Sequence, residues 1–218
     1  MFGRDRMRFN PRSVMSGGEY FLVDRFNELD AETNEGCHVN ILERDDKKVT
    51  RWKLVRSKDA NGQDIGLDYY FPYVHGHNVG WVKVIDPTDG TIVTTDFMNG
   101  CALEVCLHPD GSYVFYHDTN GRQMYTVNNA GITLCRIEGD MYLDDDTAES
   151  LTEAEKMPVV QFVCVYKVNF WHVGCFGILV NPNMKDGQYE IKGAFIPPGG
   201  CYRGYFNENI HLIQRGVR

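Results

Sequence analysis

The residues with the clearest chemical potential are a cysteine and a histidine at the two ends of a predicted hairpin. Cys101 follows the turn Asn99-Gly100, and glycine tolerates the positive φ that a sharp turn needs. His117 ends the run that returns after Asp110-Gly111, a dipeptide typical of hairpin turns. Because a hairpin brings its open ends together, we expect the thiol and the imidazole to be neighbours. An imidazolium beside a thiol favours the thiolate, so the pair could act as an activated cysteine nucleophile.

A third group is needed to orient the imidazole. Asp118 is next in the chain, but successive strand residues point to opposite faces, so it is poorly placed. A main-chain carbonyl from the segment before Cys101 is better placed. An ordinary, partly buried Cys–His pair in a hairpin is the alternative, and it stays open.

The stretch from Thr94 to Asp118 resembles the catalytic segment of the cytotoxic necrotizing factor and Burkholderia lethal factor group of bacterial toxins. The bacterial chemoreceptor glutamine deamidases are similar. The shared features are a threonine six positions before the cysteine of a Gly-Cys turn and a histidine at the end of an aromatic-rich strand. The family turn reads Leu-Ser-Gly-Cys, whereas this chain has Met98-Asn99-Gly100-Cys101. Any role of the serine hydroxyl therefore does not carry over.

The resemblance implies a toxin or effector that deamidates a glutamine side chain of a host protein to glutamate through a thioester. Cys101 would be the nucleophile and His117 the general base and acid. The main-chain carbonyl of Thr95 would orient His117, and Gly100 and Asn99 would form the turn and the oxyanion hole. The implied targets are small Rho-type GTPases or a translation-initiation helicase. The enzyme would leave the bacterial cytoplasm and act in the host cytosol, without a cofactor.

Composition narrows the alternatives. The 218 residues include 22 Lys and Arg against 30 Asp and Glu, a net charge of −8, which disfavours binding to nucleic acid. The seven cysteines are an odd number in a chain with a sizeable core, so we expect reduced thiols. No apolar run is long enough to span a membrane, and residues 1–10 do not read as a signal peptide. We expect a monomer.

The pattern of short strands predicts an α+β fold: a β-rich single domain over residues 1–218, with a central β-sandwich of mixed sheets and a few peripheral helices. Hairpins are expected at 39–56 and 102–117. Helices are expected at Gly18–Leu29, where Ser16 and Glu19 resemble a capping box, and at Asp144–Lys156. The basic residues of 1–15 predict a flexible arm.

Other motifs favour different chemistry only weakly. His75 and His77 could share a strand face as metal ligands, but no further ligand has a recognised spacing, so no metal site is predicted. The aromatic cluster around Tyr70 and Tyr73 is expected to be core or a rim for partner docking. Two other functions stay open: a non-catalytic, β-rich protein-binding module, and another thiol hydrolase or a transglutaminase that uses the same two side chains.

Overall fold

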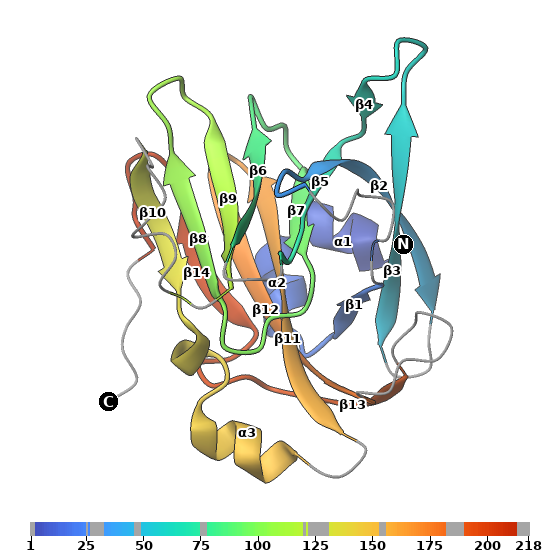
Figure 1. Cartoon of the computed structure of the whole chain (residues 1–218), viewed down its shortest axis with the longest axis vertical. Helices are drawn as coiled ribbons and strands as arrows, with labels where there is room; N and C mark the ends of the chain where they lie inside the picture. Colours follow the sequence, from blue (N-terminus) through green and yellow to red (C-terminus); the bar gives the residue numbers. More distant parts are fainter. Residues whose placement is uncertain are drawn as a thin grey trace.

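In the computed structural model, the chain forms two β-sheets packed face to face, with short helices at the periphery (Figure 1). The structure describes residues 3–24, 26, 33–45, 49–74, 78–119, 121, 131–152, 156–181 and 190–212. The predicted class, a β-rich α+β fold, is confirmed.

The larger sheet is mixed. It follows the order β1-β3-β2-β5-β7-β11-β12-β13, with β4 beside β3 and β14 beside β12. Only the pairs β1·β3 and β5·β7 are parallel among its pairings. The strands are β1 (Phe21–Val23), β2 (Cys37–Asp45), β3 (Thr50–Lys58), β4 (Asp64–Ile65), β5 (Asp68–Phe71), β7 (Ile92–Thr95), β11 (Met157–Lys167), β12 (Phe170–Val180), β13 (Ile191–Phe195) and β14 (Tyr202–Phe206).

The smaller sheet is antiparallel throughout, in the order β10-β8-β9-β6. Its strands are β6 (Val79–Val84), β8 (Ala102–Leu107), β9 (Tyr113–Asp118) and β10 (Ile132–Ile137). The predicted hairpin at 102–117 is confirmed as β8 and β9, and the one at 39–56 is confirmed as β2 and β3. Two strands that flank a short Asp-Gly turn need no distant contact to find each other, which is why the sequence predicts this hairpin well.

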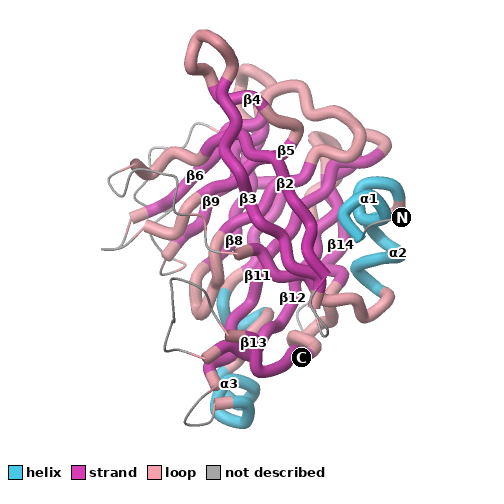
Figure 2. The backbone as a smooth tube through the Cα atoms, turned by 90° about the vertical axis from the view of Figure 1, so that its right-hand side faces the viewer, coloured by secondary structure: helices cyan, strands magenta, loops and turns pink. Residues whose placement is uncertain are grey.

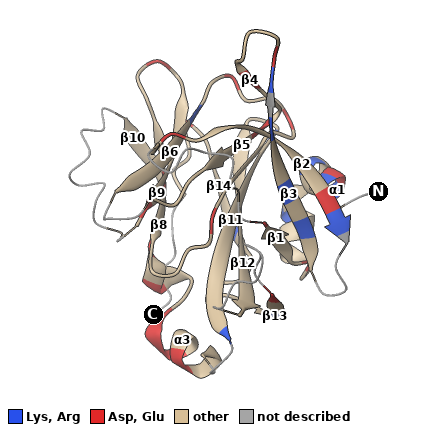
Figure 3. Ribbon diagram, turned by 45° about the vertical axis from the view of Figure 1, so that its right-hand side comes forward, with Lys and Arg blue, Asp and Glu red and all other residues tan. Residues whose placement is uncertain are grey.

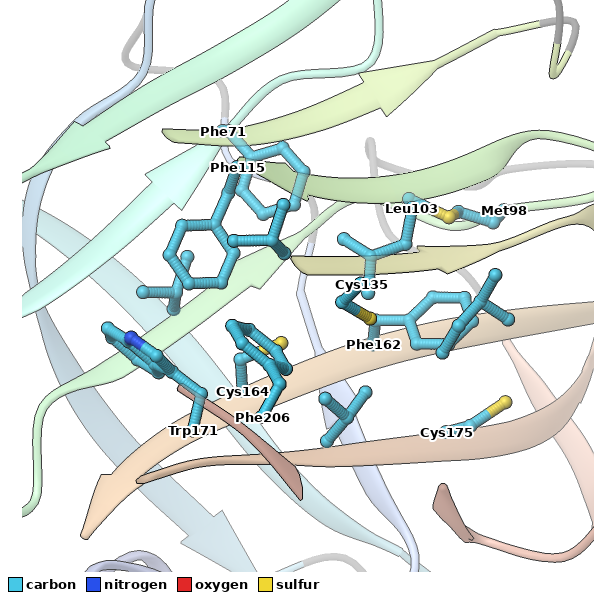
Figure 4. Close-up of a cluster of buried hydrophobic side chains, with 14 of the residues drawn as sticks. Phe71, Met98, Leu103, Phe115, Cys135, Phe162, Cys164, Trp171, Cys175 and Phe206 are labelled. Carbon is cyan, nitrogen blue, oxygen red and sulfur yellow. The ribbon is translucent and has the colours of Figure 1, made fainter. Parts of the chain in front are cut away.

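The main core fills the space between the sheets. Phe162 and Trp171 project from the larger sheet towards Leu103 and Phe115 of the smaller one (Figure 4). Inward residues alternate with outward ones along each strand, as the period of two requires. The packed layer determines the distance between the sheets. It therefore determines the distance that the segments crossing from one sheet to the other must span.

The prediction of a flexible N-terminal arm is wrong for residues 3–15. Residues Gly3–Phe9 form α1 and Pro11–Ser16 form α2, and both helices lie against the outer side of the larger sheet (Figure 2). Met7 and Met15 are fully buried there, and Arg8 forms an ion pair of 2.5 Å with the buried Asp68. The prediction gave weight to the basic residues and not to the two methionines, whose burial holds the helices against the sheet.

The predicted helix at Gly18–Leu29 is also wrong in its described part, because Phe21–Val23 is the strand β1, which pairs with β3. All three consecutive side chains are buried, whereas a helix packed on one face would leave at least one of three consecutive side chains exposed. Residues 25 and 27–29 lie outside the described part. The second helix is confirmed over its first part as α3 (Asp145–Leu151), which ends before Thr152 and does not reach Lys156, and Asp144 caps it by accepting a hydrogen bond from the Thr147 amide. No helix in the described residues is long and apolar enough to cross a membrane.

Candidate active site

Cys101 lies where the chain crosses between the sheets. Strand β7 ends at Thr95 in the larger sheet, and β8 begins at Ala102 in the smaller one. Met98 is held to Val160 of β11 by two main-chain hydrogen bonds of 2.7 and 2.9 Å. Gly100 has a φ of +84°, in the left-handed region that favours glycine. The turn therefore delivers Cys101 directly to the start of β8, as the sequence predicts.

Cys101 and His117 share one face of the hairpin. In the β8–β9 register, His117 lies opposite Leu103, and Cys101 is two residues before Leu103. Cys101 and Leu103 both belong to the core cluster between the sheets, so their side chains point inwards. Diagonal neighbours of this kind have Cα atoms roughly 7–8 Å apart. The two groups are therefore brought to the same inward face, but no hydrogen bond joins them in the described structure, because Nδ1 of His117 is bonded to Thr95 and Nε2 has no partner there.

Thr95 orders the protons of the histidine. Its hydroxyl Oγ1 donates to the main-chain carbonyl of Phe71 over 2.8 Å and lies 2.9 Å from Nδ1 of His117. A hydroxyl has one proton, and a carbonyl can only accept. The Thr95 oxygen must therefore accept the second hydrogen bond, which places the proton of the neutral imidazole on Nδ1. The other ring nitrogen, Nε2, is left as a buried lone pair with no hydrogen-bond partner among the residues that the structure describes.

Thr95 contacts His117 through a different atom from the one expected. The resemblance implied that the main-chain carbonyl of Thr95 orients His117, whereas the hydrogen bond runs through the side-chain hydroxyl. The physical reason is the position of Thr95 in β7. Its main chain lies in the plane of the larger sheet beside Phe71, and its side chain points across to the smaller sheet.

Burial keeps both groups neutral. His117 is fully buried, which lowers its pKa to about 3. Cys101 is 4% exposed, and burial raises its pKa to about 11, aided by the carboxylate of Asp118 and opposed by a main-chain hydrogen bond from Asn99. The expected lowering of the thiol pKa by an imidazolium is therefore wrong for this closed state. The resting pair is a thiol and a neutral imidazole.

Aromatic rings and a separate ion pair surround the histidine. The ring of Tyr73 meets His117 edge-on, with centroids 5.4 Å apart. Asp118 is paired with Ala102 and lies 4.0 Å from Arg136, which also binds Glu104 on the outer face of the sheet. Asp118 therefore does not orient the imidazole, as the alternation of side chains along a strand predicts.

Two contributors were missed by reasoning from the sequence. The Phe71 carbonyl depends on the parallel pairing of β5 with β7, which no local pattern signals. Tyr142 donates a hydrogen bond of 2.7 Å to the carbonyl of Cys101, although 41 residues separate them. Asn99 and Gly100, the predicted turn and oxyanion-hole residues, lie at the exposed surface beside the buried thiol.

Among the described residues, no group of three or more His, Cys, Asp and Glu side chains could hold a metal ion. His75 and His77, considered as ligands in the sequence, lie outside the described residues. All seven cysteines are buried, and none forms a disulfide bond in the part of the chain that the structure describes.

No known protein-family model matches this chain, and no curated protein matches it. Among solved structures, the chain is similar to the C-terminal domain of CNFy from Yersinia pseudotuberculosis. The TM-score is 0.36 and the sequence identity 6%, and the match covers 88% of this chain and 96% of that domain.

Proposed function

We propose that this chain is a protein-glutamine deamidase in which Cys101 attacks the substrate and His117 moves the protons. One observation carries the proposal: the hydroxyl of Thr95 holds Nδ1–H of His117 and leaves Nε2 as a free base on the face that also carries Cys101. A general base that must accept a thiol proton needs this proton order.

The neutral resting pair determines the first step. As the sulfur of Cys101 bonds to the carboxamide carbon, Nε2 of His117 takes the thiol proton, so charge develops only when substrate is present. Main-chain N–H groups at the turn, including that of Cys101, would stabilise the tetrahedral oxyanion. The imidazolium then gives its proton to the leaving nitrogen. Ammonia departs and a thioester remains.

The second step repeats the proton transfers with water. Nε2 of His117 accepts a proton from a water molecule whose oxygen bonds to the thioester carbon. The carbon–sulfur bond then breaks, and the sulfur recovers the proton from the imidazolium. The sum is one amide and one water converted to one carboxylic acid and one ammonia. If an amine intercepts the thioester in place of water, the same two side chains perform transglutamination.

The proposed substrate is a glutamine of a host protein in the GTPase or translation-factor class, modified in the host cytosol. This assignment rests on the resemblance of the segment 94–118 to the toxin group. Charge adds one constraint. The acidic residues of α3 lie at the same end of the molecule as the crossing segment between β7 and β8 (Figures 1 and 3). A target with basic residues beside its glutamine would be complementary to this end.

A second candidate is a non-catalytic protein-binding module. The observation that favours it is burial, because His117 is fully buried and Cys101 nearly so. In that case the thiol and the imidazole would only fill the core. Substrate access to Cys101 requires the structure to open at the exposed turn Asn99-Gly100, and the binding module requires no opening.

The deciding experiment compares three proteins: the parent, Cys101→Ala and Cys106→Ala. Cys106 is a matched control, since it is a buried thiol on β8, the strand that Cys101 directly precedes, and it belongs to a different cluster. Each protein is incubated with eukaryotic cytosolic extract, and conversion of glutamine to glutamate is followed by mass spectrometry and ammonia release. The proposal predicts conversion by the parent and by Cys106→Ala only. Equal conversion by all three proteins, or none by the parent, would refute it.

A further inference from the structure

The short helical turn after β10 touches the turn that carries Cys101. Residues Gly139–Met141 form the 3-10 helix η2, and β10 ends at Ile137 opposite Leu103, so the chain leaves the sheet beside the start of β8. The main chains of Gly139 and Gly100 are in contact. A Cβ atom added at Gly139 would lie 2.7 Å from Cα of Gly100 and 2.9 Å from its carbonyl carbon and oxygen. Only glycine fits at position 139.

Tyr142, which follows η2, holds the peptide group of Cys101, next to Gly100 in the chain. It is fully buried, and its hydroxyl donates to the Cys101 carbonyl over 2.7 Å. Its ring meets Phe162 of β11 edge-on, with centroids 5.3 Å apart and an interplanar angle of 84°. A hydroxyl in an apolar core is unfavourable unless it is hydrogen-bonded, so this bond determines where both the ring and the Cys101 carbonyl lie.

From these contacts we infer that Tyr142 is a positioning residue for the nucleophile, an inference that rests on the proposed function. The crossing segment is held at one end by Met98, which is bonded to Val160 in the larger sheet. Tyr142 holds its other end. Together they set the direction of the Cys101 side chain and of its main-chain N–H.

The expected kinetic signature follows from the burial of Tyr142. It lies in the core and does not touch substrate, so its loss should leave KM unchanged. A misplacement of about 1 Å at a reacting group can cost about 100-fold in rate, so kcat should fall about 10- to 100-fold when the hydroxyl is removed. Alkylation of Cys101 by iodoacetamide should become faster, because the released turn opens more often.

The test uses Tyr142→Phe, which keeps the ring and loses only the hydroxyl. Tyr113→Phe is the matched control, because Tyr113 is buried in the same cluster and its hydroxyl is bonded to Glu208 instead. The substrate is the dipeptide carbobenzoxy-glutaminyl-glycine, with ammonia release as the readout. Circular dichroism checks folding. Gly139→Ala perturbs the same turn from the other contact and should behave like Tyr142→Phe.

Support is a kcat loss of about tenfold or more in Tyr142→Phe with KM within about twofold, not shared by Tyr113→Phe. A smaller loss, or an equal loss in both variants, would overturn the inference. If the parent releases no ammonia, the proposed function fails by itself. The alkylation rates then still decide on Tyr142: faster labelling of Cys101 in Tyr142→Phe alone supports the positioning role, and equal labelling overturns it.

Discussion

Replacing Thr95 by valine removes one hydroxyl and almost no volume. In the structure this oxygen accepts from Nδ1 of His117 and donates to the Phe71 carbonyl, with both contacts buried. Thr95→Val therefore leaves one donor and one acceptor unsatisfied in the core. Each such group costs about 1–3 kcal/mol, so unfolding in urea should show a loss of roughly 2–6 kcal/mol.

The effect of Thr95→Val on activity should be larger than its effect on the amount of folded protein. Without the hydroxyl, nothing holds the proton of His117 on Nδ1, and Nε2 loses its assigned role as the base. Positioned general acid–base catalysis contributes about 100- to 10,000-fold, so deamidation by the folded variant should fall within that range. Thr95→Ser keeps the hydroxyl and loses only a methyl group, at about 1 kcal/mol, and should retain most activity.

Two measurements check this reasoning. Long-range nitrogen–proton NMR correlation identifies the tautomer of His117, which should carry its proton on Nδ1 in the parent and in Thr95→Ser. Glutamine conversion is then measured on the folded fraction of each protein. A folded Thr95→Val protein with activity within a few-fold of the parent would refute the proton-ordering role, and so would a parent in which the proton is on Nε2.

Three further predictions follow from burial. First, the pKa of His117 is about 3 in the folded protein, so between its ordinary pKa of 6.5 and pH 3 only the unfolded chain binds a proton at this residue. The unfolding free energy of the parent should therefore fall by about 1.4 kcal/mol per pH unit between about pH 6 and 3, relative to that of His117→Gln. The same pH dependence of the unfolding free energy in both proteins would contradict this. Second, the raised pKa of Cys101 predicts that iodoacetamide labels it slowly at neutral pH, with a rate that rises above pH 9; preferential labelling at pH 6 would show the opposite state. Third, Arg136→Met removes the ion-pair partner of the buried Glu104 and should cost about 3 kcal/mol in urea unfolding, partly restored by Glu104→Leu; a loss under about 1 kcal/mol would be inconsistent with this pair.

Local signals in the sequence predicted the framework of the site. The Asp110-Gly111 turn between alternating runs identified β8 and β9, and with them the placement of Cys101 and His117 at the open end of one hairpin. The helix predicted from Asp144 onward begins where α3 begins, with Asp144 as its cap. These signals depend only on residues that are neighbours in the chain, so they can be recognised in the sequence without knowledge of the fold.

The rest depends on contacts between distant segments. The Thr95 hydroxyl was missed because its partners come from β5 and β9, and the parallel β5·β7 pair is formed over a long connection. The direction of the Cys101 pKa shift was missed because burial depends on what the opposite sheet places over the thiol. The helices α1 and α2 were missed for a similar reason, because Met7 acquires a burial site only when the larger sheet has formed.

The central claim is that Cys101 forms a covalent bond with a glutamine carbonyl while ammonia leaves. Rapid acid quenching of the parent with carbobenzoxy-glutaminyl-glycine, followed by intact-mass and peptide analysis, tests it directly. We predict one acyl group per chain, attached at Cys101, and none in Cys101→Ala. Glutamate produced without any adduct on Cys101, or produced equally by Cys101→Ala, would contradict the account.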